Sequence, residues 1–289
     1  MRTIAHIVNP FIAASSSDLS WAQPITFESM RRARRKARDY VDVKLYSAQF
    51  KEDRSIVPES FLKTNDLERS VLDLETFKTK LKLPIIGDIL NRLYQESEAE
   101  YLIYTNIDIG LYPDFYLKVN QFIDRGYDAF IINRRRLTDE LNRVDELEKI
   151  YGEKGRSHPG FDCFVFHRDL FPHFQLADIC IGVPFIGITL SQNLFAVAKN
   201  FQLFEEEKLS FHLGEEIFAK RAPKEYFKYN QKQFWKAMNS ELKKELDIRK
   251  FPYSKQNYFV RWIKWGLQPS IPIRLAIKLE YKRIFSAKS

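Results

Sequence analysis

The stretch Tyr101–Tyr116 reads YLIYTNIDIGLYPDFY and begins as a run of apolar and β-prone residues that ends at Asn106, Ile107 and Asp108. A turn containing Pro113 and a helix-like segment follow it. This pattern predicts a buried strand whose carboxyl end presents an amide and a carboxylate close together. Because ligands bind at the carboxyl ends of strands in open α/β sheets, we expect the functional site here. Oxygen atoms of these two kinds suit a hard cation or a sugar hydroxyl.

Strand-like and helix-like segments alternate outward from this stretch, which predicts an α/β fold with a mostly parallel central sheet and helices on both faces. Strands are expected at 3–9, 41–48, 128–133 and 163–166, with an irregular strand pair within 201–211. Helices are expected at 26–40, 113–125 and 186–199, and another begins at Pro84. We expect residues 1–220 to form this domain and residues 221–289 to form a basic α-helical extension.

Composition places the chain among globular proteins with a sizeable core, because 45% of its 289 residues are hydrophobic. The two cysteines, Cys163 and Cys180, lie in apolar runs without zinc-type spacing, so we expect buried thiols in a reducing compartment. The opening residues are too polar for a signal peptide, and no apolar run reaches the length of a membrane span. We therefore expect a cytoplasmic protein.

Positive charge is concentrated near the carboxyl terminus. Residues 241–289 contain 12 of the 46 Lys and Arg residues but only 4 of the 38 Asp and Glu residues, a net charge of +8 that equals that of the whole chain. Tyr258, Trp262 and Trp265 lie among these cations. Aromatic and basic residues together favour contact with anionic lipid at the inner face of the membrane, whereas a helical appendage packed on the body is the alternative. No nucleic-acid-binding motif accompanies the charge.

Polar residues stand at four predicted strand ends that would converge on one cleft. These are Asn9-Pro10, Asn106 with Asp108, Asn133-Arg134-Arg135-Arg136, and the segment from His158 to Asp162. Guanidinium groups pair bidentately with phosphate oxygens, so the arginines would neutralise a diphosphate, unless they form a solvated turn paired with acidic residues. Asp162 directly precedes a predicted buried strand, where it is either a general base or a cap of its own turn.

His212, in the segment LSFHLGEE, comes just before a glycine at a predicted strand end. A histidine in this position can bind a metal or contact phosphate. A lone histidine is more often structural, so both interpretations stay open at this point.

Four segments in this order and spacing resemble the nucleotide-diphospho-sugar transferase group, the glycosyltransferases of the GT-A fold. They are TNIDIGLYPDFY, GYDAFIINRRR, HPGFDCFVFHRDLFP and FHLGEE. The opening NPFIAASSSDLSWAQPITFESM resembles uncharacterised bacterial members of the group. The resemblance covers about residues 1–215 and implies that a sugar nucleotide binds at the carboxyl edge of the sheet.

The resemblance also implies roles for individual residues. Asn106 and Asp108 occupy the place of the Asp-x-Asp strand end that holds Mn²⁺ or Mg²⁺ against the diphosphate, and His212 fits the late residue that completes the metal site. Asp162 matches the loop that contacts the acceptor and supplies the base, with His158 beside it. The residues implied in donor binding are Asn9, Pro10, Gln23, Thr26, Asn106, Asp108, Asn133, Arg134 and Arg135.

Asn106 departs from the pattern, because it stands where the first acid of the motif is expected. Amides are weaker ligands for hard cations than carboxylates. Metal binding would therefore depend on Asp108, His212 and the diphosphate, or Arg134–Arg136 would supply the positive charge instead.

The sequence thus predicts a glycosyltransferase that moves a sugar from a nucleotide-diphosphate donor to a hydroxyl of a glycan or lipid-linked acceptor. Two alternatives stay open. Nucleotidyl transfer uses a similar sheet and a metal, but its usual Gly-rich loop is absent from NPFIAASSS after the first strand. A catalytically silent sugar- or nucleotide-binding protein is favoured by the amide at Asn106.

Overall fold

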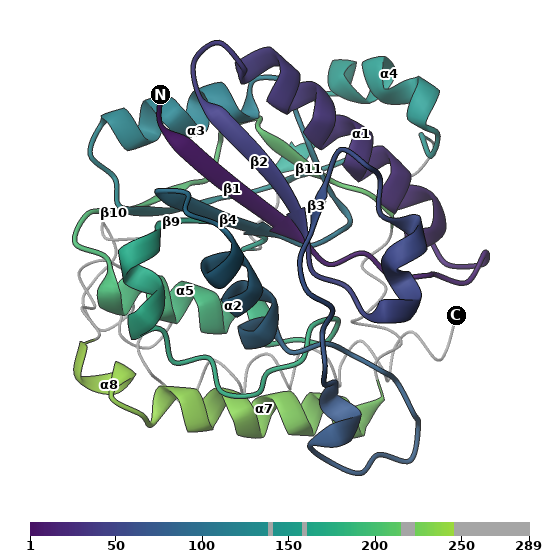
Figure 1. The fold of residues 1–289 in the computed structure, drawn as a ribbon, viewed down its shortest axis with the longest axis vertical. Coiled ribbons are helices and arrows are strands. Elements are labelled where there is room, and N and C mark those ends of the chain that lie inside the picture. The colour runs from purple at the N-terminus through teal and green to yellow at the C-terminus, as the bar shows by residue number, and fades with distance from the viewer. Residues whose placement is uncertain (138–140, 158–160, 215–222, 246–289) are drawn as a thin grey trace. The chain divides into compact units, whose positions relative to one another are not determined.

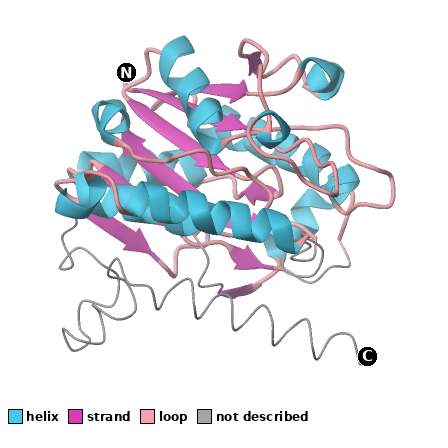
Figure 2. Cartoon of the chain, turned by 90° about the horizontal axis from the view of Figure 1, so that it is seen from below, coloured by secondary structure: helices cyan, strands magenta, loops and turns pink. Residues whose placement is uncertain are grey.

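The computed structural model describes residues 1–137, 141–157, 161–214 and 223–245; the others are drawn grey in Figure 1 and Figure 2. The chain forms two compact units. The first comprises Met1–Arg69, Gly87–Pro172 and Lys199–Glu215. The second comprises Ser70–Ile86, His173–Ala198 and Glu216–Ser289. The division at residue 220 that charge placement suggested stays a prediction.

A seven-stranded sheet in the order β10-β6-β9-β4-β1-β2-β3 forms the centre of the first unit. Its strands are β1 (Thr3–Val8), β2 (Asp42–Ser47), β3 (Leu62–Lys63), β4 (Tyr101–Thr105), β6 (Ala129–Ile132), β9 (Cys163–His167) and β10 (Phe201–Phe204). Only β9 runs antiparallel, against β4 on one side and β6 on the other. The mostly parallel α/β sheet predicted from the sequence is confirmed.

Helices of the first unit cover both faces of this sheet. Helices α1 (Leu19–Ala37) and α3 (Phe115–Asp124) lie on one face, and α2 (Ile86–Glu96), all but Ile86 in this unit, lies on the other (Figure 1). Met30 of α1 and Val119 of α3 share one core cluster with Ile103 of β4. Burial on both faces explains why the central strands read as nearly continuous apolar runs instead of alternating patterns.

The helix expected at 26–40 begins seven residues earlier than its sequence predicts, at Leu19. The helix therefore contains Pro24, and a proline inside a helix removes one backbone hydrogen bond. In the folded chain, Leu19, Ala22 and Ile25 are buried, and their burial offsets that loss.

The strand pair expected within 201–211 is also different, since its two strands belong to different sheets. β10 extends the large sheet beside β6, whereas β11 (Ser210–His212) joins a four-stranded sheet in the order β5-β11-β7-β8. The other members of this small sheet are β5 (Ile109–Leu111), β7 (Arg135–Arg136) and β8 (Arg156–Ser157). The segments 106–108 and 133–134 connect strands of the large sheet directly to strands of the small one.

The second unit is mainly helical in its described residues. It contains α5 (Ile186–Val197), α7 (Lys224–Met238) and α8 (Leu242–Glu245). Asn230 of α7 accepts a hydrogen bond from the Cys180 backbone N–H at 3.0 Å and donates to the Cys180 carbonyl at 2.9 Å. Cys163 and Cys180 are both buried free thiols, as predicted.

Helix α7 agrees with the helical extension expected after residue 220, but most of the basic segment 241–289 lies outside the described residues. Its contact with an anionic membrane stays a prediction. None of the helices in the described part of the chain is both long and apolar enough to cross a bilayer.

A buried histidine links β1, β4 and α3. The Nδ1 atom of His6 lies 2.8 Å from the Tyr116 hydroxyl, and Nε2 lies 2.9 Å from the Thr105 hydroxyl. Both ring nitrogens therefore have partners while the imidazole is neutral. Burial lowers the pKa of His6 from 6.5 to about 3.

His6 makes folding sensitive to acid. Because its pKa is lower in the folded than in the unfolded state, its contribution is complete above pH 6.5 and is lost as the pH falls toward 3. We expect the free energy of unfolding to decrease by about 2.5 kcal/mol more between pH 7 and pH 4.5 in the wild type than in His6→Gln. Urea titrations at both pH values measure this difference, and equal decreases in the two proteins would contradict it.

Candidate functional site

Strand pairing brings three of the predicted strand ends to one edge of the large sheet. Cys163 of β9 pairs with Thr105 of β4 and with Ile132 of β6. Because β9 is antiparallel to both neighbours, the residue before it, Asp162, is at the same edge as the residues that follow β4 and β6. These are Asn106 and Asn133, so the register alone places the three side by side.

Asp108 and His212 are held together by the small sheet. Ile109 of β5 pairs with His212 of β11, and the Leu213 backbone N–H donates to the Asp108 carbonyl at 2.9 Å. The Oδ2 atom of Asp108 then lies 3.2 Å from Nε2 of His212. Both side chains are mostly buried, with 19% and 5% of their surface exposed.

The electrostatic environment keeps Asp108 ionised. Burial raises the pKa of its carboxyl, but the hydrogen bond from His212 and the positive charge of Arg134 outweigh burial. The pKa therefore lies below its ordinary value. Arg134 contacts Asp162, which precedes β9 at the same edge of the sheet as Asn106.

The Asp108–His212 pair suits a divalent cation. The other carboxylate oxygen of Asp108, Oδ1, is buried and has no hydrogen-bond partner within the described residues. Neighbouring ligands of an octahedral cation lie about 3 Å apart, given metal–ligand distances of about 2.1 Å, which is close to the 3.2 Å measured here. The described residues contain no group of three His, Cys, Asp or Glu side chains that would hold a metal. The pair thus fits a cation whose remaining ligands are phosphate oxygens and water.

Asn106 has a different environment from Asp108. The Tyr104 hydroxyl donates to the Asn106 side-chain carbonyl oxygen at 2.8 Å. With that oxygen engaged, the side chain offers its N–H₂ group, which is a donor. A donor suits a phosphate or sugar oxygen instead of a cation, so the departure from the acidic motif changes the chemistry at this position.

Arg134 and Asp162 form a largely buried ion pair, in which Nη1 of the guanidinium contacts Oδ1 of the carboxylate. Only 8% of the arginine side chain and 12% of the aspartate side chain are exposed. The second oxygen of Asp162 is buried and accepts no hydrogen bond from the residues that the structure describes. One carboxylate oxygen thus contacts a cation, and the other is left without a hydrogen-bond partner among the described residues.

The three consecutive arginines do not act as one cluster. Arg134 precedes β7, whereas Arg135 and Arg136 belong to it and alternate across the small sheet. Arg135 donates to the carbonyl oxygens of Lys154 and Gly155, at 3.2 and 3.0 Å. Its guanidinium therefore supports the connection to β8, while Arg134 faces the strand-end site.

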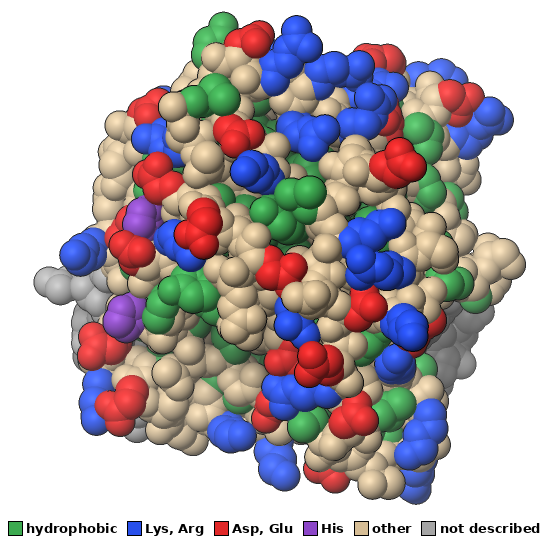
Figure 3. Space-filling view, viewed as in Figure 1, with side chains coloured by type: hydrophobic (Ala, Val, Ile, Leu, Met, Phe, Trp, Pro, Cys, Tyr) green, Lys and Arg blue, Asp and Glu red, His purple; other side chains and the backbone are tan. Residues whose placement is uncertain are grey.

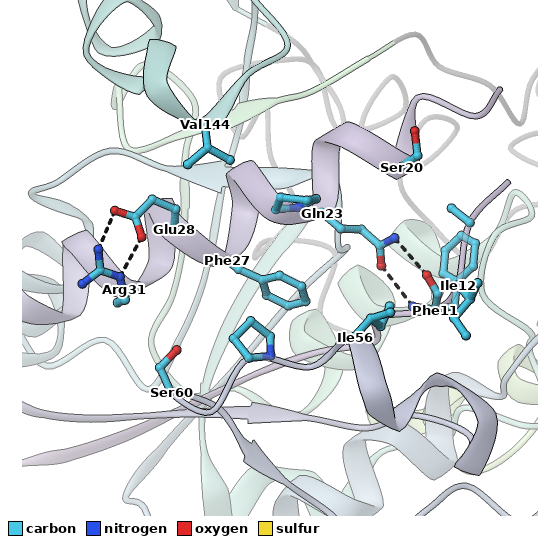
Figure 4. A pocket seen from close by; sticks show the side chains of 13 residues that line it. Phe11, Ile12, Ser20, Gln23, Phe27, Glu28, Arg31, Ile56, Ser60 and Val144 are labelled. Carbon is cyan, nitrogen blue, oxygen red and sulfur yellow. Dashed lines mark hydrogen bonds and ion pairs between the residues drawn. The ribbon is translucent and has the colours of Figure 1, made fainter. Parts of the chain in front are cut away.

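The loop after β1 borders a pocket of about 520 Å³ (Figure 4). The Gln23 side chain accepts from the Phe11 backbone N–H at 3.0 Å and donates to its carbonyl at 2.9 Å. Asp53 accepts from the Ile12 backbone N–H at 2.7 Å, and Asn9 donates to the Ala48 carbonyl. Gln23 thus lines the pocket mainly by holding the loop in place.

The structure also places two other residues predicted to bind the donor, Pro10 and Thr26. Pro10 lies between Asn9 and the pocket residue Phe11, and Thr26 is fully buried in α1. His158 lies outside the described residues.

Sequence reasoning missed the end of the β1–α1 loop. Gly214, with φ of +80°, lies so close to Asp18 that an added Cβ would come within 2.8 Å of the Asp18 Cβ. The loop therefore begins at the carboxyl end of β1 and ends beside Gly214, which is close to His212 in sequence. No motif marks Asp18, because only the fold brings it to this place.

Comparison with solved structures supports the fold, whereas two sequence comparisons found no match. No protein-family model matches the chain, and none of the curated proteins matches it. Among solved structures, residues 1–349 of S. aureus TarS in complex with UDP-GlcNAc align with a TM-score of 0.52 at 12% identity. This alignment covers 96% of our chain and 80% of that chain.

Two other solved structures are less similar. One is glucosyl-3-phosphoglycerate synthase from Mycobacterium tuberculosis with Mn²⁺, UDP and glucosyl-3-phosphoglycerate, at a TM-score of 0.47 and 14% identity, covering 83% of our chain and 79% of that chain. The other is 4-diphosphocytidyl-2C-methyl-D-erythritol synthase from Anaerococcus prevotii, at a TM-score of 0.40 and 11% identity. This alignment covers 80% of our chain and 98% of that chain. Sheet order, strand directions and the TarS alignment together show that the chain has the GT-A fold of nucleotide-diphospho-sugar transferases.

Proposed function

We propose that the protein transfers a sugar from a nucleoside-diphosphate donor to a hydroxyl group of an acceptor. The observation that carries this proposal is the meeting of two polar pairs, Asp108 with His212 and Arg134 with Asp162, at one edge of the sheet. The first pair suits a cation and the second suits a proton transfer. Glycosyl transfer from a diphosphate uses positive charge beside the leaving group and a proton acceptor for the attacking hydroxyl.

The nucleoside is proposed to occupy the pocket beside the β1–α1 loop. Phe11 and Phe27 line it with their rings, and Pro58 adds further apolar surface (Figure 4). A base can pack against such rings, while Ser20 and Ser60 offer hydroxyl groups. Asn9 and Pro10 connect this pocket to the strand ends where the diphosphate would lie.

Positive charge for the leaving diphosphate is proposed to come from two sources. Asp108 and His212 would hold Mn²⁺ or Mg²⁺, which stabilises negative charge on phosphate oxygens when bound. Arg134, which contacts Asp162 at the strand ends, adds a guanidinium, and Asn106 adds an N–H₂ donor. Groups fixed before the reaction stabilise developing charge most effectively, because they need not reorganise.

Asp162 is proposed to accept the proton of the acceptor. As the acceptor oxygen bonds to the anomeric carbon, the bond from that carbon to the diphosphate breaks and the hydroxyl proton moves to the carboxylate. The ion pair with Arg134 holds one oxygen of Asp162 and orients the other.

A catalytically silent binding protein is the second candidate, favoured by the engaged amide oxygen of Asn106. Isothermal calorimetry with a panel of nucleoside-diphosphate sugars, with and without Mn²⁺, tests both candidates. We expect one nucleotide class to bind at least about tenfold more tightly with Mn²⁺, and mass spectrometry to show released nucleoside diphosphate. Binding without any turnover would favour the silent protein, and the absence of binding to the whole panel would contradict both.

A further inference from the structure

The second half of α1 is strongly basic and borders a groove that adjoins the pocket of the β1–α1 loop, because Glu28 and Arg31 line both. Six residues near the end of the helix are cationic. Five lie within α1, Arg31, Arg32, Arg34, Arg35 and Lys36, and Arg38 follows its last residue. Four of them line a groove of about 470 Å³ between α1 and α4 (Leu147–Gly152). Figure 3 shows Lys and Arg side chains gathered along the top of the molecule, where this half of α1 lies in Figure 1.

Helical spacing explains why these cations share one face. Arg31 and Arg35 are four residues apart, as are Arg32 and Lys36, so the two members of each pair lie on the same face of α1. Two carboxylates also line the groove, Glu28 and Glu148, which leaves an excess of two positive charges among the lining residues. Lys36 also contacts the carboxylate of Asp114, and counting that charge leaves an excess of one positive charge, so the groove attracts anions.

The internal ion pairs arrange the cations instead of neutralising all of them. Glu28 accepts from Arg31 at 2.6 Å and from Arg32 at 2.8 Å, and Arg32 also contacts Glu148 at 2.7 Å. Arg35 is exposed and forms no ion pair or hydrogen bond with the described part of the chain. Lys36 is exposed as well and contacts Asp114 at 2.8 Å. Both exposed cations, Arg35 and Lys36, line the groove.

The groove lacks what a membrane or a nucleic acid would use. None of the large exposed hydrophobic side chains of the described residues lines it, so it offers no apolar anchor for a lipid surface. Its single aromatic residue, Tyr151, packs its ring against Tyr112 and Phe211, at centroid distances of 5.8 and 6.2 Å. That ring is therefore engaged inside the protein and is no platform for stacked bases.

We propose that the α1–α4 groove binds a polyanionic chain without bases, one that carries repeated phosphate or carboxylate groups. The charge excess, the exposed cation pair and the elongated run of basic residues suit several anionic groups in succession. The groove shares Glu28 and Arg31 with the proposed nucleoside pocket, but none of its lining residues belongs to the strand-end pairs of Asp108 with His212 and Arg134 with Asp162.

Binding of fluorescently labelled inorganic polyphosphate to the full-length chain tests the proposal. We expect Arg35→Ala/Lys36→Ala to weaken binding at least about tenfold and to reduce the slope of log K against log salt by about 1.4, or about 0.7 per cation removed. The charge-matched control Lys51→Ala/Lys63→Ala, at exposed positions outside the groove, should change affinity by less than about twofold. Glu148→Gln should act in the opposite direction and tighten binding about threefold, because it removes a carboxylate from the groove.

Three results would overturn the proposal. Equal losses in the two double variants would show a response to net charge alone. Unchanged binding in Arg35→Ala/Lys36→Ala would place the polyanion elsewhere, for example on the basic residues 241–289. Tighter binding to phosphatidylglycerol vesicles or to single-stranded DNA than to polyphosphate would assign a different partner. Because no donor is present in these measurements, their outcome does not depend on sugar transfer.

Discussion

In an Asp108→Asn variant, we expect sugar transfer to fall by about 10²- to 10³-fold, which corresponds to about 3 to 4 kcal/mol of barrier. The side chain keeps its shape but loses the charge that is held 3.2 Å from His212. A neutral amide binds a hard cation weakly, so the leaving diphosphate loses stabilisation. Steady-state release of nucleoside diphosphate measures the effect, and a thermal unfolding curve checks that the variant is folded.

Asn106→Asp is the matched control for this prediction. The Tyr104 hydroxyl can donate to a carboxylate oxygen as it does to the amide oxygen, so the local hydrogen bond is kept. We expect this variant to remain active and to reach half-maximal rate at a Mn²⁺ concentration several-fold lower. Turnover within about threefold of wild type in Asp108→Asn, less than 1 kcal/mol of barrier, would exclude the proposed role of Asp108.

The second large effect is expected in Asp162→Asn. Loss of a general base typically costs a factor of 10² to 10⁴, and we expect turnover to fall within that range while the donor still binds. The same change removes a carboxylate from the largely buried guanidinium of Arg134. Breaking a buried ion pair on one side is costly, so the free energy of unfolding should decrease by about 3 kcal/mol.

The double variant Arg134→Gln/Asp162→Asn separates these two roles. Two neutral amides replace the ion pair, and much of the lost stability should return, because no charge is left buried. Turnover should remain low, since an amide cannot accept a proton. Recovery of turnover together with stability would mean that Asp162 acts only through folding, and that the proton acceptor is a different group.

The strand ends at Asn106 and Asp162 could be identified from the sequence alone. An apolar run flanked by polar residues identifies a buried strand and its ends. Alternation of such runs with helical periodicity also predicted a mostly parallel α/β sheet, which the structure confirms. These features depend on local patterns, and local patterns can be read without coordinates.

Strand direction and partnership could not be read in the same way. A short apolar run has the same pattern in a parallel and an antiparallel strand, so the antiparallel β9 was not expected. It is this direction that places Asp162 beside Asn106. Likewise, Arg134 and Arg135 are alike in sequence, but the start of β7 turns one toward the site and the other toward the carbonyl oxygens of Lys154 and Gly155.

By itself, the sequence determined where strands and helices form and which polar residues stand at their ends, because burial and periodicity act along the chain. Only the tertiary structure decided which of these residues meet. The contact of Asp108 with His212 joins positions more than one hundred residues apart in sequence, through the pairing of β5 with β11. The approach of Asp18 to Gly214 likewise depends on the path of a loop. Pairing between distant segments depends on the packing of the whole domain, and no local pattern records it.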